Sequence, residues 1–208
     1  TMVDAPVVGA ALKLDSAMTM NTLGLKVKLV DMGKIDDMIP QVAVGLQYKA
    51  ASGDIIDALA AGNVISSKTG TDFYVAATKF VNIGGKKVVM NGTLRATKAN
   101  TLGVLGFGGG AAGNDSYKIL PEASVGVFAA DNIVLGAEVR GKPNNISATA
   151  FGIQEGTAYD LFMVYFVNKN MSITTAYANL GQVGPSQAAG IGMAKKQDGF
   201  YIQMQVNF

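Results

Sequence analysis

Apolar and polar residues alternate along most of this chain, and no run of about 18 or more apolar residues breaks the alternation. Successive side chains of a β-strand point to opposite faces, so a period of two predicts strands. The clearest case is the C-terminal run Phe200–Phe208, where the aromatic and aliphatic residues fall on one face and Tyr201, Gln203, Gln205 and Asn207 on the other. The pattern predicts an all-β fold without transmembrane helices.

The same period recurs in nine segments: Leu23–Val30, Gln41–Tyr48, Thr71–Val81, Lys86–Lys98, Tyr117–Ala129, Ile133–Arg140, Thr157–Asn168, Asn170–Gly181 and Phe200–Phe208. Nine is an odd number, whereas bacterial transmembrane barrels use even numbers of strands. Either Pro6–Leu14 supplies a tenth strand, or strands that precede residue 1 are missing from this sequence.

The connections between these segments alternate between short and long. The short ones are 31–39, 82–85, 130–131 and 169, and the long ones are 50–70, 99–116, 141–156 and 182–197. An up-and-down barrel in an outer membrane has short periplasmic turns and long extracellular loops, whereas a soluble meander has no reason to sort its loops by side. The order predicts antiparallel, sequential strands with the long loops at one end.

Alternation alone does not say which face of the sheet lies inside. Hydrophobic residues make up 49% of the chain and charged residues only 15%, against roughly 25% in a typical soluble domain. The polar faces are rich in small and uncharged residues. These features favour apolar side chains on the outside, and the 208 residues are therefore expected to form a single domain, a transmembrane antiparallel up-and-down β-barrel integral to an outer membrane. A soluble β carrier, with the opposite sidedness, is the rival interpretation.

The chain contains no Cys and no His, which removes disulfides, thiol chemistry and the commonest general base and metal ligand. The net charge of +2 gives no nucleic-acid signal. We therefore expect no enzyme activity, no cofactor and no metal site. Gly106–Gly110 lacks the Gly-Lys-Ser/Thr of a phosphate loop and is interpreted as a mobile loop tip. Asp72, Asp115, Asp131 and Asp198 are interpreted as turn or loop residues.

One long connection has a helical pattern. Asp54–Asn63 begins with a residue type that caps helices and ends with Gly62 and Asn63. We expect a short helix that packs Ile55 and Leu59 onto the barrel rim.

On this assignment of faces, ten polar side chains line the barrel interior: Lys26, Lys28, Lys49, Arg95, Glu122, Glu138, Arg140, Asp160, Gln203 and Gln205. Charges of both signs across a pore would select solutes, and the same charges could pair with one another and plug a small barrel. Glu138 and Arg140 project to the same side of one segment and form the first pair to examine.

Several stretches resemble an uncharacterised family of Gram-negative outer-membrane proteins, catalogued as a domain of unknown function. They are Pro40–Lys49, Gly70–Lys79, Asn91–Asn100 with Leu105–Gly109, Gly136–Arg140 with Lys142-Pro143, Asp160–Asn170 and the closing strand. The resemblance runs from about Leu23 to Phe208 and implies a porin-like barrel without known catalytic residues. It also implies additional strands before Leu23, a complete barrel of 12 to 14 strands, and an extracellular loop over residues 1–20.

The expected function is that of a porin-like passive channel for small solutes, with apolar solutes suggested by Gly- and Ala-rich walls. The alternative is a structural or interaction barrel with a blocked lumen, which assembles with itself or with a partner in the membrane. The expected partners are outer-membrane lipid, a second copy of the chain, and the barrel-assembly machinery, through the terminal strand that ends at Phe208.

Overall fold

The computed structural model describes residues 2–3, 18–35, 37–147, 154–182 and 196–206. Ten strands form one antiparallel sheet in which each strand pairs with its neighbours in the sequence. They are β1 (Met2–Val3), β2 (Met18–Val30), β3 (Gln41–Ser52), β4 (Thr69–Ile83), β5 (Lys86–Thr97), β6 (Lys118–Ala130), β7 (Ile133–Arg140), β8 (Ala158–Asn168), β9 (Met171–Gln182) and β10 (Lys196–Val206). Because β1 has only two residues, nine long strands make up the sheet.

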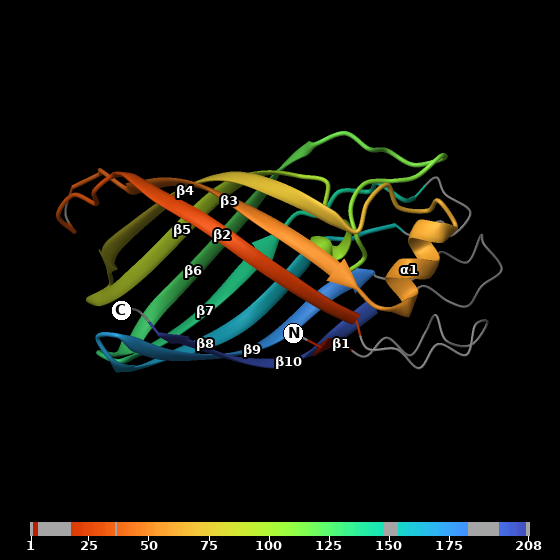
Figure 1. Ribbon diagram of the computed structural model, residues 1–208. Helices are drawn as coiled ribbons and strands as arrows, with labels where there is room; N and C mark the ends of the chain where they lie inside the picture. The colour runs from red at the N-terminus through yellow and green to blue at the C-terminus, as the bar shows by residue number, and fades with distance from the viewer. Residues whose placement is uncertain (1, 4–17, 36, 148–153, 183–195, 207–208) are drawn as a thin grey trace.

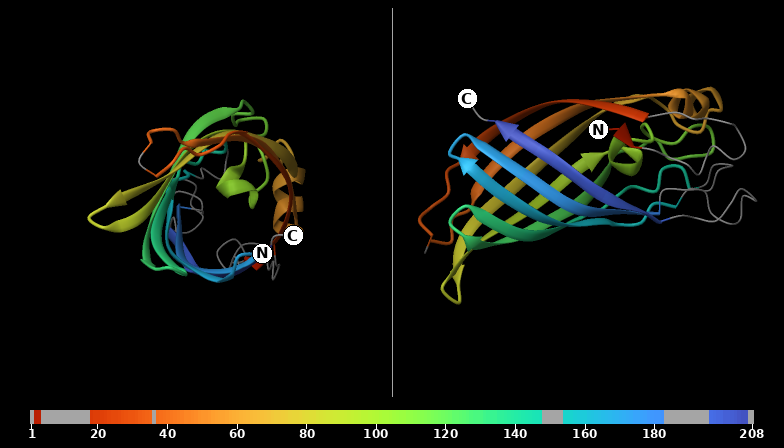
Figure 2. Two further views of the ribbon diagram at one scale, coloured as in Figure 1. Left: turned by 90° about the vertical axis from the view of Figure 1, so that its left-hand side faces the viewer. Right: turned by 90° about the horizontal axis from the view of Figure 1, so that it is seen from below.

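The sheet curls about an axis so that its strands surround a central space, as Figure 2 shows end-on. Sequence analysis predicted this all-β, up-and-down topology, and the structure confirms it. The predicted closure is not seen: among the described strands no pairing joins β10 to β1 or β2, so the sheet is an open half-barrel. β2 and β10 are accordingly exposed on both faces over most of their length, unlike the central strands.

The predicted strand bounds agree with the structure to within a few residues, except for β2. This strand begins at Met18, so that residues 18–20 belong to the sheet and not to an extracellular loop. The candidate strand Pro6–Leu14 and the terminal Phe208 lie outside the described residues.

The long and short connections are sorted to opposite ends of the sheet, as predicted. Helix α1 (Asp54–Ala61) and the 3₁₀ segment η1 (Asn100–Gly103) lie at one end, and the tight turns and the end of β10 lie at the other (Figure 1). In the β4–β5 turn, Gly84 and Gly85 have φ of 58° and 74°. Two successive positive φ values are what a tight hairpin turn requires, and glycine adopts them without steric cost.

The outer face of the curl is apolar. Leu23 and Leu25 on β2 and Phe200 and Ile202 on β10 are 61% to 86% exposed. Similar side chains recur at alternate positions of the central strands, including Leu94 and Leu161. Exposed apolar surface on this scale marks an interface with a partner or a membrane. None of the helices in the described part of the chain has the length and hydropathy to cross a bilayer.

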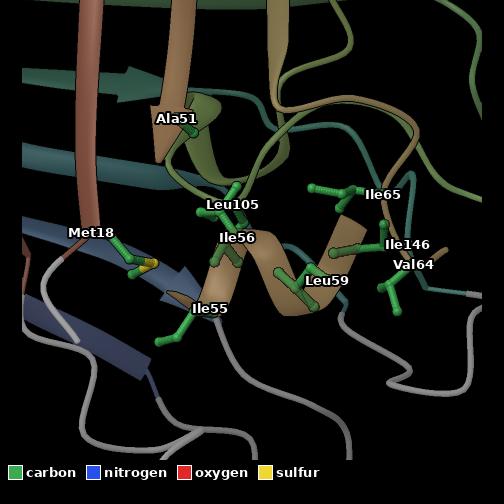
Figure 3. Close-up of a cluster of buried hydrophobic side chains, with 9 residues drawn as sticks. All are labelled: Met18, Ala51, Ile55, Ile56, Leu59, Val64, Ile65, Leu105 and Ile146. Carbon is green, nitrogen blue, oxygen red and sulfur yellow. The ribbon is translucent and has the colours of Figure 1, made fainter. Parts of the chain in front are cut away.

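A cluster of buried apolar side chains lies under the long loops at one end of the sheet. Ile55, Ile56 and Leu59 of α1 pack there with side chains from β2, β3 and three loops (Figure 3). The predicted packing of α1 on the rim is thus confirmed. The predicted cap is wrong, because Gly53 is the N-cap residue and Asp54 lies in the first turn. There its carboxylate interacts favourably with the positive end of the helix dipole.

Candidate functional site on the concave face

Charged side chains meet on the concave face of the sheet, starting at β3 and β4. The Lys49 ammonium lies 2.7 Å from Oδ2 of Asp72, and Nη1 of Arg95 lies 3.7 Å from the same oxygen. The Thr97 hydroxyl donates a hydrogen bond to Oδ1 of Asp72. The Asp72 side chain is fully buried. A carboxylate so completely removed from water needs these partners, because an unpaired buried charge is strongly destabilising.

Arg95 connects this group to the next strand. Its Nε and Nη2 donate to the two carboxylate oxygens of Glu122 at 2.7 and 3.0 Å, and its Nη1 donates to Oε1 of Gln47 at 2.9 Å. The guanidinium also lies over the Tyr74 ring, 5.1 Å from its centroid. A two-point Arg–carboxylate contact fixes both orientation and distance. Arg95 is therefore held on four sides.

The pattern continues across β6, β7 and β8. Glu122 is directly opposite Arg140 in the sheet, and Glu138 is opposite Asp160. Arg140 forms an ion pair with Glu138 of its own strand, which is the pair singled out from the sequence. From β3 to β7 positive and negative side chains thus alternate around the concave face, whereas Glu138 and Asp160 place two acidic groups opposite each other. We call Lys49, Asp72, Arg95, Glu122, Arg140 and Glu138 the charged belt.

A cavity of about 190 Å³ opens beside the charged belt. Its walls carry Lys26 from β2 and Arg95, Glu122, Glu138 and Arg140 from the belt, and uncharged polar side chains together with two alanines complete the lining. The cavity can hold several water molecules. Most of the side chains that line it are polar or charged.

The connection after β5 folds into the space that the curled sheet surrounds (Figure 2). We call residues 98–110 the inward segment. Phe107, which is 2% exposed, lies against Gly70, and its backbone forms a bridge to Ser67. Asn145 from the β7–β8 connection donates from Nδ2 to the Lys98 carbonyl and to Oδ1 of Asn100.

The inward segment also contacts the belt itself. The Lys49 ammonium donates to the Leu102 carbonyl at 3.1 Å. A gap of only about 20 Å³ remains between the belt and this segment, and Lys49, Arg95 and Leu102 line it. That space suits about one water molecule. The inward segment therefore covers one end of the belt closely.

The ten side chains predicted to line the interior do not all meet. Lys26, Lys49, Arg95, Glu122, Glu138, Arg140 and Asp160 come together at the belt and its cavity. Lys28 instead pairs with Asp31 near the short-turn end, where both side chains are largely exposed. Gln203 and Gln205 lie on β10 at the sheet edge, opposite Thr174 and Ser172, and are exposed.

Three expectations from the sequence are wrong. Asp198 is not a turn or loop residue but lies in β10, where its carboxylate accepts a hydrogen bond from the Tyr177 hydroxyl. Asp72 is not a turn residue but the buried centre of an ion-pair group in β4. Asp72 falls on the same face of the strand as Tyr74 and Ala76. This shared face was the sequence signal that could have identified Asp72 as a strand residue. Gly106–Gly110 is not an exposed loop tip, because residues 106–109 are buried. Positive φ values at Gly106 and Gly108 turn this chain inward.

Sequence analysis missed a second charged pair beside the inward segment. Lys142 follows β7, Glu155 precedes β8, and their charged groups lie 3.6 Å apart with both side chains fully buried. The Thr101 backbone N–H donates to both carboxylate oxygens of Glu155 at 2.8 and 2.7 Å. Burial raises the pKa of Glu155 to about 7, despite the opposing attraction of Lys142 and the hydrogen bonds from Thr101. Burial likewise lowers the pKa of Lys142.

The curled sheet has an apolar outer face and a charged concave face. These features define a class of β-proteins whose polar side chains lie inside the curl and whose apolar side chains lie outside it. Residues 3–205 match the family described as protein of unknown function, DUF3034. The chain belongs to that family, in agreement with the resemblance to an uncharacterised family. No curated protein and no solved structure matches the chain.

Proposed function

We propose that this protein is an integral, porin-like β-barrel of a Gram-negative outer membrane, and that it passively admits small polar solutes without enzymatic activity. One observation carries the proposal: apolar side chains cover the convex face, while the charged belt lines the concave face. A soluble β carrier would have the reverse arrangement, since its core must be apolar. Rows of opposite charges around a central space favour passage of hydrated, polar molecules.

Contact with lipid follows from the same sidedness. Transmembrane strands expose an apolar band outward, and the alternate positions of β2 through β10 supply one. In lipid, backbone groups at a strand edge also need hydrogen-bond partners, because no water is available to them. The proposed partners are therefore outer-membrane lipid along the convex face, the barrel-assembly machinery at β10, and a second copy that pairs the β2 and β10 edges between chains.

The inward segment favours a second candidate function, a structural barrel whose lumen is blocked. Leu102 rests on Lys49, and only a gap of about 20 Å³ separates the segment from the belt. A barrel plugged in this way would anchor or assemble with partners and would admit nothing.

Conductance across planar lipid bilayers distinguishes the two functions. The purified chain, folded in detergent, is added to a bilayer of outer-membrane lipids, and discrete current steps are expected for a channel. Uptake of small polar solutes into proteoliposomes should follow, faster than uptake of apolar solutes of equal size. A bilayer that stays sealed at high protein load would contradict the channel and leave the structural barrel. Recovery of the protein from cells without detergent would contradict both.

A further inference from the structure

Three phenylalanine rings lie on the concave face, away from the charged belt. Phe80 of β4, Phe128 of β6 and Phe166 of β8 each lie six positions after a residue already placed on that face, as Phe128 does after Glu122. An even spacing along a strand keeps side chains on one face, so the three rings share the concave face with the belt. Six positions span about 20 Å along a strand. The rings therefore lie toward the end of the sheet with the tight turns (Figure 1). We call Phe80, Phe128 and Phe166 the aromatic row.

The rings of the aromatic row approach one another across the strands that separate them. The ring centroids of Phe80 and Phe128 are 6.1 Å apart, and those of Phe128 and Phe166 are 6.5 Å apart. Their strands are second neighbours in the sheet, whose backbones lie about 10 Å apart. The rings therefore lean together, as side chains do on the inner side of a curved sheet. The planes of Phe128 and Phe166 differ by only 6°, so a flat apolar molecule can lie parallel to both.

One cation faces the aromatic row. The Lys87 ammonium lies 4.6 Å from the ring centroid of Phe80 and 4.8 Å from that of Phe128. Lys87 is exposed, and none of the ion pairs formed within the described part of the chain includes it. Lys49 and Arg95 in the belt, by contrast, are each paired with a carboxylate. The Lys87 ammonium is therefore available to the negative charge of a solute.

On the side of the belt, the aromatic row borders apolar side chains. Val89, Val134 and Phe162 gather there, and a Cβ at Gly126 would lie 2.7–3.7 Å from atoms of all three. Phe166 is 40% exposed, so part of the row stays open to a ligand. A sugar would need several hydrogen-bond partners beside the rings, and these three side chains provide none. A molecule with an apolar body and one negative charge matches the rings, their apolar border and the single cation.

We propose that the aromatic row and Lys87 form a binding site for small aromatic carboxylates. The ring of the solute packs against Phe128 and Phe166, and its carboxylate binds the Lys87 ammonium. The inference rests on the proposed channel function in one respect, because it names the class of solute that the channel favours. Binding itself is a property of the concave face and is measurable without any conductance.

Binding of 2-naphthoate to the chain folded in detergent tests the site, because this carboxylate is fluorescent and the chain contains no Trp. Fluorescence anisotropy, corrected for empty micelles, gives the dissociation constant. Lys87→Gln should raise that constant about tenfold, since it removes one charge-assisted contact. Lys86→Gln is the matched control, because Lys86 is also exposed but lies one position away on β5, on the opposite face. This control should bind 2-naphthoate like the wild type.

A neutral probe of similar shape separates the contribution of charge from that of apolar contact. The wild type and Lys87→Gln should bind 2-naphthylmethanol equally well. Phe128→Leu should weaken the binding of both probes about threefold to tenfold, because ring contact is lost. Lys87→Arg keeps the positive charge and should retain 2-naphthoate binding, which guards against misfolding as the cause of a loss.

Two results would overturn the site. The first is equal affinity of the wild type and Lys87→Gln for 2-naphthoate, because the carboxylate would then not bind Lys87. The second is displacement of 2-naphthoate by cyclohexanecarboxylate at the same concentration as by benzoate, because the rings would then not favour a flat aromatic body.

Bilayer current separates this inference from the proposed function. In a channel that carries the site, 2-naphthoate should interrupt the current carried by potassium chloride, and Lys87→Gln should abolish the interruptions. Binding without any current would leave the site standing and contradict the channel. Current without binding would leave the channel standing and overturn the site. Current that 2-naphthoate leaves unchanged, in a chain that binds it, would contradict the place of the site on the solute path.

Discussion

The ring of Phe107 occupies the space where a side chain on Gly70 would lie. A Cβ at Gly70 would come 2.3 Å from Cδ1 of Phe107, although 36 positions of the chain separate the two residues. The absence of a side chain on β4 therefore decides how closely the inward segment approaches the sheet. Glycine is required here for close approach, not for an unusual backbone conformation.

The first prediction tests this contact. Gly70→Ala should displace Phe107 and destabilise the packing of residues 98–110 by about 1–3 kcal/mol, as expected for overpacking. Limited proteolysis within that segment measures the effect, and cleavage should accelerate. Gly92→Ala on β5 is the matched control, because a Cβ there meets nothing within 4 Å. Equal cleavage rates for the two variants would show that Phe107 is not held by Gly70.

The second prediction concerns the centre of the charged belt. Asp72→Asn leaves Lys49 and Arg95 with a neutral partner in a fully buried position. Breaking a buried ion pair on one side costs about 3–5 kcal/mol of unfolding free energy. Because the substitution removes one negative charge from the belt, it should also shift the reversal potential of any current toward anion selectivity. Asp131→Asn serves as the control, and an unchanged denaturation midpoint for Asp72→Asn would contradict the belt.

The third prediction concerns the core beneath the loops. Ile56 of α1 is fully buried in this core, so Ile56→Ala should lower the unfolding free energy by about 2–5 kcal/mol. Ile83→Ala removes the same atoms from a residue that is 58% exposed and should have a much smaller effect. Urea denaturation in detergent, monitored by circular dichroism, compares the two. Comparable losses would show that the packing of α1 contributes little to stability.

The fourth prediction tests the membrane environment of the convex face. Leu135 is the third residue of β7 and is 50% exposed, so in a bilayer Leu135→Lys should cost up to about 4 kcal/mol, depending on its depth. Folding into lipid vesicles, followed by the heat-dependent shift in electrophoretic mobility, reports the loss. Met38→Lys, in the exposed β2–β3 turn, is the control. A neutral effect of Leu135→Lys would place this face in water and contradict the proposed location.

The strands were predictable because their period of two is imposed by backbone geometry, independently of distant contacts. The residues of the charged belt share one face for the same reason. Their pairing was only partly predictable, since Glu138 and Arg140 lie two positions apart on one strand. The contacts of Arg95 instead join β5 to side chains on β3, β4 and β6. They depend on the register of these strands and on the length of the Arg95 side chain, which reaches residues that are not directly opposite it.

The inward segment was not predictable from its own residues. Its glycines indicate a flexible loop, and the contacts that fix its position come from distant parts of the chain, among them Gly70 on β4, Lys49 on β3 and Asn145 in another connection. Glu155 likewise gave no signal, because a single carboxylate in a loop belongs to no periodic pattern. The fold alone brings Thr101 and Lys142 to this carboxyl group, and its burial raises the pKa although both neighbours act in the opposite sense.

The alternation of signs around the charged belt has a consequence for how such a protein can vary. Asp72, Arg95 and Glu122 each have oppositely charged neighbours on adjacent strands, so reversing one of these signs leaves like charges side by side and perturbs more than one hairpin. Exchanging both members of a couple, as in Arg95→Glu combined with Glu122→Arg, restores the local balance of attraction across β5 and β6. Related sequences should accordingly differ at these positions by compensated swaps, and isolated reversals should be rare.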